Sequence, residues 1–489
     1  MKHHRPKTGV PSRTHYMNYR LLCVVCQCAR MSRHVLKPAT FGLRYLLLAF
    51  LCIPVSATIN VKDYGALGDG TYNDTAALNS GFLAACSASE DVYIPTGTYL
   101  VTSLDTLHNC GITFYGDGPS NTILKLMAPA RTSMWTFDGS PERTPALVIK
   151  DLALDGGHLG GAGIAIERYQ AITINRVSFN YFGTPGYSLG HKNDFDGLYI
   201  RNVENARVTD SQFTGNERYG VELQAVHSST VQNSTMSFNG SMGGVSEQNF
   251  EGPLDGPLVA QWIDNTLIAN GSGGIDVETD PKLPPAQGVL RRNQVIDCGN
   301  DKWDAGWGLV LGLHSYGRIE ENWIENFAAH ASARTYTNAV VYGRNAGPID
   351  IVNNTVIGTR SHAVLGQQGS SPVTISGNIL LDNGAGIFIY QSPHVRITNN
   401  TISNSAGSGI ELLWSYGSTI TRNHFDGNEC DLKINGRTIT RPPTPSGQLY
   451  DLNGAMHQRR ARRAAFDRDP RTVVEITPLR NYRCYWSAA

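Results

Sequence analysis

Short stretches of alternating apolar and polar residues recur along most of the chain, each beginning at a glycine or another small residue. Eleven such segments superimpose when written one above another: "AGIAIER", "DGLYIRN", "YGVELQA", "GGVSEQN", "GGIDVET", "WGLVLGL", "NAVVYGR", "HAVLGQQ", "AGIFIYQ", "SGIELLW" and "CDLKING". Their second residues are Gly163, Gly197, Gly220, Gly244, Gly274, Gly308, Ala339, Ala363, Gly386, Gly409 and Asp431. The spacing returns repeatedly to 22–24 residues and is otherwise longer. This pattern indicates one repeated structural unit with loops inserted between some of its copies.

A second column of the repeat lies before each segment, where an apolar-x-apolar step ends in an amide or an acid. Its members are Asn175, Asp210, Asn233, Asn265, Asn293, Asn322, Asn354, Asn378, Asn400 and Asn423. Asparagine tolerates the left-handed backbone of a tight turn, and its side chain can hydrogen-bond an asparagine stacked above it. We therefore expect each repeat to contain strand, turn and strand, with the asparagines in a ladder.

The period and the absence of helical segments restrict the fold class. Period-two strands about every 23 residues, with no helices between them, cannot form βαβ units. A propeller blade would need roughly 40 residues. One repeat cannot bury its own apolar face, but a stack of repeats buries a continuous core. The pattern predicts an all-β, single-stranded, right-handed parallel β-helix of about eleven rungs within residues 58–440.

The first 57 residues have the features of an export signal. Arg44 precedes the apolar run "YLLLAFLCIPV", which is too short to span a bilayer, and "VSA" ending at Ala57 is a small-x-small cleavage site. A start at Met31 would give the signal ordinary proportions, so residues 1–30 fit a mis-assigned start. We expect a secreted or periplasmic protein, cleaved after Ala57 and not held in a membrane.

The segment that follows is dense in glycine, aspartate and asparagine: "INVKDYGALGDGTYNDTAALNSGF", then "VYIPTGTYLV". Asn73 or Asp74 can cap a helix, and its apolar residues are Ala76, Ala77, Leu78, Phe82 and Leu83. Such a helix is suited to covering the open first rung of a β-helix. We expect residues 59–100 to be an N-terminal cap, and the 441–489 segment after "RPPTPSG" to be a C-terminal tail.

These capping motifs resemble the N-terminal segment of pectate lyase superfamily proteins of the rhamnogalacturonase, epimerase and phage tailspike type. The motif resemblance covers Ile59 to about Leu100, and the repeats extend it to about Asn435. It implies a pectin lyase-like right-handed parallel β-helix and an association with polysaccharides. The shared residues belong to the cap, so the resemblance assigns no catalytic residue.

Composition narrows the partners and the cysteine chemistry. The formal net charge is +0 and charged residues make up only 17% of the chain, which gives no reason to expect nucleic acid or an anionic membrane as partner. Five cysteines remain after cleavage, too sparse for a disulfide framework, although Cys86 and Cys110 could close one loop. An odd number leaves at least one thiol free.

The chemistry is expected on the outward side of the repeated strands. After each small residue the first and third positions point inward, so the second and fourth point outward. The outward residues of successive rungs are Ala165 and Glu167, Tyr199 and Arg201, Glu222 and Gln224, Ser246, Asp276 and Glu278, Val310 and Gly312, Val341 and Gly343, Leu365 and Gln367, Phe388 and Tyr390, and Glu411 and Leu413. Acids gather on the early rungs, where the longest inserted loops also lie, and loops beside a rigid sheet often build binding walls.

The sharpest catalytic candidates are Asp276 and Glu278 in "GGIDVETD". On one face of a strand they lie about 6.5–7 Å apart along the backbone, near the separation that inverting glycoside hydrolysis uses. Glu222, two rungs away, is a candidate third acid or sugar ligand. The bland alternative is that these are solvated outward side chains, as most exposed acids are.

The candidate substrate-binding residues surround these three acids. They are Tyr199, Arg201, Gln224, His227, His314, Asp194 and Asp196. Arg201 and the histidines could orient or neutralise a substrate group. "KNDFDG" with Asp194 and Asp196 is an alternative acidic pair that faintly resembles the "NTDG" motif of polygalacturonases, but the "DD", "GHG" and "RIK" motifs are not present in order.

Three function classes follow, ranked narrowly in this order and favouring an enzyme. The first is a polysaccharide hydrolase, acting on a polymer that can contain uronates, with paired carboxylates and neither metal nor cofactor. The second is a uronate lyase or epimerase, which would use a cation such as calcium to neutralise the substrate carboxylate. The third is a non-catalytic glycan-binding or tailspike-like surface protein. The oligomeric state is not predicted.

Overall fold

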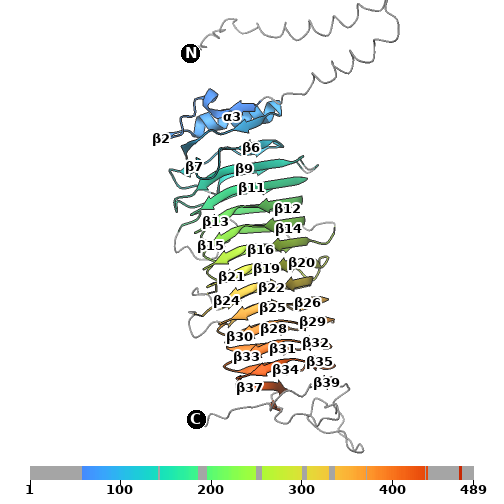
Figure 1. Ribbon diagram of the computed structural model, residues 1–489. Helices are drawn as coiled ribbons and strands as arrows, with labels where there is room; N and C mark the ends of the chain where they lie inside the picture. Colours follow the sequence, from blue (N-terminus) through green and yellow to red (C-terminus); the bar gives the residue numbers. More distant parts are fainter. Residues whose placement is uncertain are drawn as a thin grey trace, which may run out of the picture. The chain divides into compact units, whose positions relative to one another are not determined.

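The computed structural model describes residues 58–130, 132–140, 142, 144–184, 195–248, 256–299, 305–329, 336–369, 372–435, 437–438 and 473–475. The predicted leader and most of the predicted C-terminal tail lie outside these residues. Parallel strands stack rung upon rung, with a short helix at the N-terminal end of the stack (Figure 1). The predicted all-β parallel β-helix of about eleven rungs with an N-terminal capping helix is confirmed.

Three parallel ladders of strands run the length of the solenoid, joined by tight turns. The first sheet carries the repeated segments: β8 (Ser133–Asp138), β10 (Ala162–Glu167), β12 (Leu198–Thr209), β14 (Val221–Gln232), β16 (Met242–Gln248), β19 (Gly273–Thr279), β22 (Ala305–Leu311), β25 (Tyr336–Tyr342), β28 (His362–Gln367), β31 (Ala385–Tyr390), β34 (Ser408–Leu413) and β37 (Cys430–Ile434). The strands β10 to β37 are the eleven repeats that the sequence predicts.

The other two sheets close each rung. The second comprises β9 (Leu147–Asp155), β11 (Ala171–Asn180), the ends of β12 and β14, β17 (Val259–Ile263), β20 (Ala286–Arg291), β23 (Ser315–Glu320), β26 (Ile349–Val352), β29 (Val373–Ser376), β32 (Val395–Thr398), β35 (Thr419–Thr421) and β39 (Val473–Glu475). The third adds to the ends of β9 and β11 the short strands β13 (Gln212–Thr214), β15 (Thr235–Ser237), β18 (Thr266–Ile268), β21 (Gln294–Ile296), β24 (Trp323–Glu325), β27 (Thr355–Ile357), β30 (Ile379–Leu381), β33 (Thr401–Ser403) and β36 (His424–Asp426). Strand β38 (Arg437–Thr438) pairs antiparallel with β37.

The interior is a continuous apolar core, as the inward positions predict. Ile164, Leu198, Ile275 and Leu309 are fully buried at the same inward position of successive or near-successive rungs. Each buried aliphatic side chain contributes roughly 1.5–3 kcal/mol relative to exposure. Because every rung lends its apolar side chains to its neighbours, the stack stabilises what one repeat could not.

An asparagine ladder fixes the turn between the second and third sheets. Side-chain amides bond from one rung to the next along Asn265, Asn293, Asn322, Asn354, Asn378, Asn400 and Asn423, at 2.9–3.1 Å. The predicted ladder is confirmed for these seven. The left-handed backbone conformation, however, falls on the preceding residue, such as Asp264 or Asn353. Asp210 and Asn233 lie one position earlier in the turn and Asn175 two positions earlier, and they bond one another at the surface.

The N-terminal cap contains β1 (Thr58–Asn60), the 3₁₀ helix η2 (Val61–Tyr64), β2 (Asp69–Asn73), α3 (Thr75–Ala88), β3 (Asp91–Tyr93), β4 (Gly97–Val101), β5 (Leu107–His108), β6 (Thr113–Tyr115) and β7 (Thr122–Leu126). Asn73 caps α3 by accepting the Thr75 N–H at 3.1 Å, whereas Asp74 makes no side-chain cap bond and instead accepts from Leu67 and Gly68. Leu78 and Phe82 are buried as expected, but Leu83 is 48% exposed.

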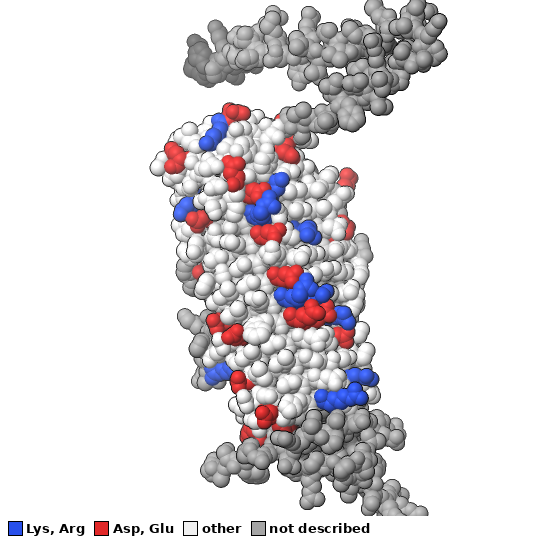
Figure 2. Space-filling view, in the orientation of Figure 1, with Lys and Arg blue, Asp and Glu red and all other residues white. Residues whose placement is uncertain are grey.

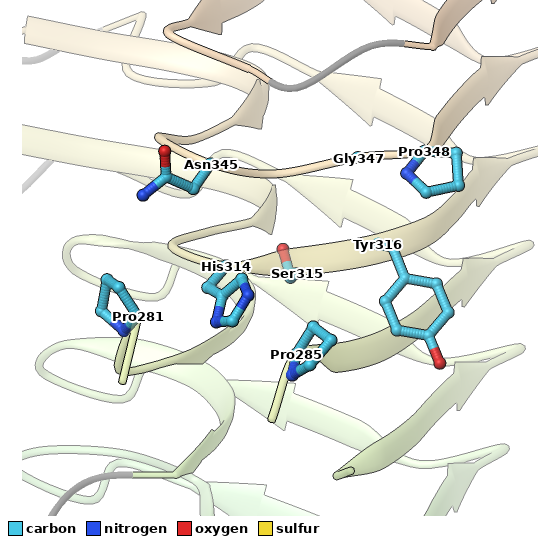
Figure 3. Close-up of a pocket in the computed structure, with 8 residues that line it drawn as sticks. All are labelled: Pro281, Pro285, His314, Ser315, Tyr316, Asn345, Gly347 and Pro348. Carbon is cyan, nitrogen blue, oxygen red and sulfur yellow. The ribbon is translucent and has the colours of Figure 1, made fainter. Parts of the chain in front are cut away.

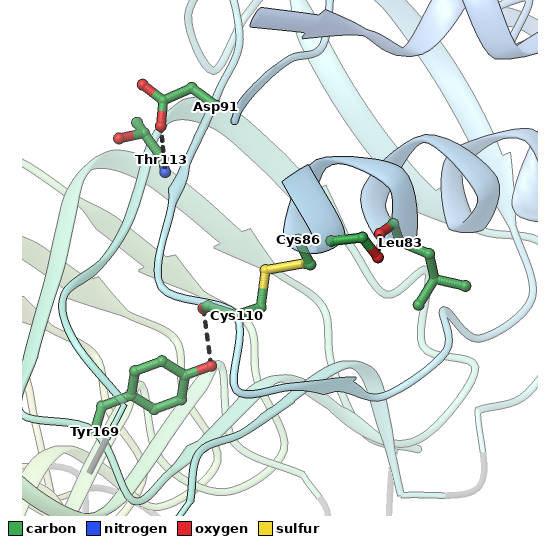
Figure 4. Close-up of a disulfide and its surroundings, with 7 residues drawn as sticks. Leu83, Cys86, Asp91, Cys110, Thr113 and Tyr169 are labelled. Carbon is green, nitrogen blue, oxygen red and sulfur yellow. Dashed lines mark hydrogen bonds between the residues drawn. A yellow bond between two sulfur atoms is a disulfide. The ribbon is translucent and has the colours of Figure 1, made fainter. Parts of the chain in front are cut away.

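A disulfide ties the capping helix to the first rungs. Cys86 at the end of α3 is bonded to Cys110, and the Tyr169 hydroxyl donates to the Cys110 carbonyl at 3.0 Å (Figure 4). The predicted Cys86–Cys110 pairing is confirmed, and Cys298 is a buried free thiol.

On the face of the solenoid that Figure 2 draws, the charged side chains do not form a field of one sign. In the view of Figure 2, acidic and basic side chains lie in mixed groups separated by wide uncharged areas. Exposed pairs across rungs include Arg176 with Asp151 and Arg292 with Asp264, each at 2.6 Å. No helix in the described part of the chain is long and apolar enough to cross a bilayer.

Candidate functional site

The outward face of the first sheet carries the acids that the sequence predicts, in two columns fixed by the strand register. Tyr199 lies beside Glu222, and Arg201 beside Gln224, on neighbouring strands β12 and β14. Asp276 and Glu278 project from the same face of β19, because residues two apart on a strand share a face.

The outward positions of β16 differ from the prediction. Val221 of β14 pairs with Gly244 and Gln224 with Glu247, so Val245 and Glu247 face outward. Ser246, predicted outward, is fully buried and accepts a hydrogen bond from Trp262 Nε1 at 3.0 Å. The repeat glycine of this rung is therefore Gly243. Gly244 makes room for the Trp262 ring, which a Cβ there would meet at 2.0 Å.

The corrected register places a further acid in the cluster. Glu247 pairs with Glu278 on the next strand, and Val245 with Asp276. Paired residues on neighbouring parallel strands lie about 4.8 Å apart, so the two carboxyl groups are stacked. The sequence prediction missed Glu247 because the double glycine "GG" allows two registers, and the apolar Val245 favoured the wrong one.

Asp276 is held in a dry and poorly satisfied environment. It is 6% exposed, and its Oδ1 atom is buried without a hydrogen-bond partner. Burial raises the pKa of Asp276 well above its ordinary value, and the neighbouring Glu278 and Glu247 carboxylates raise it further. Asp276 is therefore the group in this cluster best suited to holding a proton near neutral pH.

Glu278 has a different environment, at the mouth of the cluster. Burial raises its pKa, with Glu247 adding to the effect, while a hydrogen bond from the Leu313 backbone N–H opposes it. A Cβ added at Gly312 would lie 2.7 Å from Glu278 Oε2 and 3.2 Å from Asp276 Oδ1. The two oxygens therefore both lie against the backbone at Gly312 and are less than about 6 Å apart, at or below the separations typical of paired glycosidase carboxylates.

Glu222 lies two rungs away and belongs to a second group of charges. Arg218 Nη1 donates to Glu222 Oε2 at 2.6 Å and to Asp196 Oδ2 at 3.3 Å. Asp196 is fully buried and also accepts the Tyr219 N–H. Burial raises the pKa of Glu222 well above its usual value, Asp196 adds to this, and Arg218 opposes it.

Arg218 is the residue of this group that the sequence did not suggest. Its guanidinium stacks on the Tyr219 ring at 4.1 Å. Burial lowers the pKa of Arg218, but Asp196 and Glu222 more than offset this and the net shift is upward. Arg218 and Tyr219 precede the repeat glycine Gly220, outside the alternating columns, so the repeat pattern gave no signal for them.

A chain of two hydrogen bonds runs from Tyr199, which lies beside Glu222, to Glu247. The Tyr199 hydroxyl donates to Gln224 Oε1 at 2.6 Å, and Gln224 Nε2 donates to Glu247 Oε1 at 3.3 Å. Burial raises the pKa of Glu247, while Arg218 and Gln224 oppose that rise. Burial and the Glu222 carboxylate together keep the Tyr199 hydroxyl protonated by raising its pKa. Arg201 lies half-buried beside Gln224.

The two predicted histidines do not join these acids. His227 lies past the left-handed residue Ala225, in the part of β14 that belongs to the second sheet, and its Nε2 is 3.8 Å from Glu204. His314 lies in the turn after β22, two residues beyond Gly312. Asp194 lies outside the described residues.

His314 lines an open cleft of about 600 Å³, and none of the acids described above is among its lining residues (Figure 3). Its other lining residues are Pro281, Pro285, Ser315, Tyr316, Asn345, Gly347 and Pro348. In Figure 3 the His314 ring lies between Pro281 and Pro285. Pro281, the first of these residues in the sequence, lies three residues after Glu278. The cleft is therefore lined from just past the C-terminal end of β19.

The described residues contain no group of three or more His, Cys, Asp or Glu side chains arranged to hold a metal ion. The five acids are instead distributed as the Arg218 group and the Asp276–Glu278–Glu247 group, which we call the acid cluster. This arrangement can move protons and hold a polar ligand through hydrogen bonds.

Comparisons with known proteins agree with the fold. Residues 58–251 match the family model described as rhamnogalacturonase A/epimerase, pectate lyase-like, and residues 338–440 match a right-handed β-helix region. Mannuronan C5-epimerase AlgE6 of Azotobacter vinelandii is 26% identical over 236 residues, which are 45% of this chain and 23% of that protein. A glucan 1,3-β-glucosidase of Cochliobolus carbonum is 28% identical over 197 residues, 34% of this chain and 23% of the relative.

A solved structure extends the likeness over most of the chain. The A-module of mannuronan C-5 epimerase AlgE4 from Azotobacter vinelandii superimposes with a TM-score of 0.54 at 21% identity, covering 78% of this chain and 99% of the module. The chain matches well under two thirds of the length of these curated relatives. The predicted resemblance is confirmed at the level of fold: the chain is a pectate lyase-like right-handed parallel β-helix protein.

Proposed function

We propose that this protein hydrolyses glycosidic bonds of a polysaccharide between the carboxyl groups of Asp276 and Glu278. The observation that carries the proposal is that oxygens of both groups lie close together against Gly312, with Asp276 buried and one of its oxygens unpartnered. An outward acid with no role would be solvated, whereas a carboxyl group held dry is costly and fits the environment of a general acid.

In this hydrolysis the carboxyl groups of Asp276 and Glu278 have opposite roles, acid and base or nucleophile. Asp276 gives its proton to the glycosidic oxygen as the bond from the anomeric carbon to that oxygen breaks. In an inverting mechanism Glu278 takes a proton from the water whose oxygen bonds to the anomeric carbon. In a retaining mechanism Glu278 itself bonds to the anomeric carbon, and water then hydrolyses this glycosyl-enzyme bond. Glu247 supports the site by keeping negative charge beside Asp276, and Glu247 and Glu222 can hydrogen-bond sugar hydroxyls.

Export would bring the site to its polymer. Cleavage after Ala57 would release the protein outside the cytoplasm, where polysaccharides are accessible. The cleft at His314 and the face around Tyr199, Arg201 and Gln224 would then hold the sugars on either side of the cleaved bond.

The lyase or epimerase alternative draws support from the epimerase names of the matched relatives. It would need a cation to neutralise the substrate carboxylate and a base such as a tyrosine or histidine. The alternative of a glycan-binding protein without catalysis remains the third candidate.

Incubation of the full chain with a panel of neutral, pectic and alginate polysaccharides separates these functions. A hydrolase gives new reducing ends without unsaturated-uronate absorbance. A lyase gives both signals and a chelator removes them, and an epimerase changes the sugar without cleaving it. Binding with no product from any polymer would exclude both enzymatic functions.

A further inference from the structure

The charge around the proposed catalytic pair is strongly one-sided. In the Arg218 group and the acid cluster, taken together with Arg201, five carboxyl groups stand against two guanidinium groups. The carboxyl groups are those of Asp196, Glu222, Glu247, Asp276 and Glu278, and the cations are Arg201 and Arg218.

The cation nearest to Glu222 is already engaged. Arg218 bonds both Asp196 and Glu222 and is 18% exposed, so its charge is used within the protein. Arg201 lies three strands away from Glu278, on the far side of Gln224 and Glu247. No cation among the described residues is one of the groups that shift the pKa of Asp276 or Glu278, whose charged neighbours are carboxylates.

The described outward residues of the rungs that follow Glu278, from β22 to β31, are uncharged. Gly312 and Gly343 occupy the outward position that Glu278 holds one rung before, and they form a floor without side chains. Beside them Val310, Val341 and Leu365 pack against Phe388 as a ridge. Arg344, the next residue after this floor, donates to Gln368 Oε1 at 2.6 Å.

Such a surface recognises a sugar by its hydroxyls and its apolar face, and disfavours a carboxylate. A uronate carboxylate bound beside the pair would stand within about 5 Å of the Glu278 carboxylate and close to that of Glu247, where like charges in a partly buried site repel strongly. Sugar hydroxyls can instead donate hydrogen bonds to these carboxylates.

We infer that the polymer is uncharged at the cleaved residue: the site takes a neutral polysaccharide and discriminates against polyuronates. This inference rests on the proposed function, since it concerns the sugar held between Asp276 and Glu278. The chain would thus differ in substrate charge from the mannuronan epimerases whose fold it shares.

The test uses matched polymers that differ only in charge. Polygalacturonate and polymannuronate are each compared with their own carboxyl-reduced form, which keeps the linkage and removes the carboxylate, together with native neutral glucans and galactans. Reducing-end formation by the full chain gives activity, and affinity electrophoresis gives binding. We expect a preference of at least about 10-fold for an uncharged polymer over its charged counterpart, equivalent to about 1.4 kcal/mol.

Glu247→Gln provides a variant with one charge fewer beside the pair. It should narrow the ratio of neutral to charged substrate by roughly 3-fold or more, since it removes part of the repulsion. Glu411→Gln is the matched control, because Glu411 is an outward acid of β34, at the far end of the same sheet, and should leave the ratio unchanged. Added salt should improve the binding of polyuronate and leave that of the neutral polymer unchanged.

The outcomes separate this inference from the proposed function. Equal or better turnover of a polyuronate overturns the inference and leaves hydrolysis intact. Preferential binding of neutral polymers with no cleavage overturns hydrolysis and supports the inference. Failure to bind any polymer of the panel overturns both.

Discussion

The two halves of the first sheet share one backbone and differ on their outward face. From β12 to β19 the outward columns hold carboxyl groups that burial and mutual repulsion keep at raised pKa values. From β22 to β31 the same columns hold Val310, Val341, Leu365 and Phe388, which pack as a second apolar cluster. Both halves are equally well formed inside, so the β-helix requires only its inward residues. Buried acids on the outward face are a cost that the fold does not need, and this is the physical reason to assign function there.

The largest expected effect comes from removing either member of the proposed pair. Asp276→Asn and Glu278→Gln should each lower the rate of reducing-end formation by about 100-fold or more, the usual size of a lost general acid or base. The neutral side chains also relieve repulsion, so thermal stability should be retained or increased. Glu411→Gln, in the other half, should keep full activity. Variants that keep most of the activity would remove the distinction between the two halves.

Replacing Arg218 should lower the free energy of unfolding, because it leaves two buried acids of the β12 to β19 half without their cation. Arg218→Met leaves Asp196 and Glu222 buried without their cation, which costs about 3–5 kcal/mol at neutral pH. Because protonation of the two acids relieves that cost, the destabilisation should shrink as the pH falls. Denaturant titrations at two pH values measure it, with Arg292→Met, which removes an exposed surface pair, as the control. A loss that is the same at both pH values would contradict this account.

A side chain at position 312 tests the arrangement of the Asp276 and Glu278 carboxyl groups without changing a charge. Gly312→Ala places a methyl group 2.7 Å from Glu278 Oε2 and should reduce activity about 10-fold or more, since reacting groups must be held in a narrow geometry. Gly81→Ala is the control, because a Cβ in α3 makes only ordinary contacts and raises helix propensity. Thermal melting establishes that both variants are folded. Full activity of Gly312→Ala would show that catalysis does not depend on this arrangement of the two carboxyl groups.

The smallest effect is on the pH dependence of stability. The acid-cluster groups have folded pKa values above their unfolded ones, so their contribution is fully present below the unfolded values of about 4–4.5 and is lost as the pH rises through the folded values. The free energy of unfolding should therefore fall from about pH 4.5 toward neutrality, and Glu278→Gln should make that slope shallower. Substitution of Glu411, which lies at the other end of the same sheet in β34, should leave the slope unchanged.

Much of this contrast between the halves was accessible from the sequence. A period of two within a period of about 23 determines which side chains face outward, and it identified Asp276, Glu278 and Glu222 correctly as outward residues. The same alternation indicated that acids give way to apolar residues along the sheet.

What the sequence could not supply depends on the exact register and on the turns. Glu247 was missed because one residue of slip at a double glycine exchanges the two faces of a strand. Arg218 was missed because it lies in a turn, and His227 was misplaced because the left-handed bend at Ala225 carries it to the second sheet. The burial of a side chain and the loss of its hydrogen-bond partners, as for Asp276 Oδ1, depend on residues of neighbouring rungs. They can be recognised only in the three-dimensional structure.

The most direct test of the central claim is the origin of the oxygen at the new chain end. Brief cleavage of the preferred polymer in ¹⁸O-labelled water, followed by mass spectrometry, distinguishes hydrolysis from elimination. Hydrolysis by Asp276 and Glu278 predicts one ¹⁸O atom at each new reducing end, and loss of this product in Glu278→Gln but not in Glu411→Gln. Products that are unsaturated and carry no label would contradict the account.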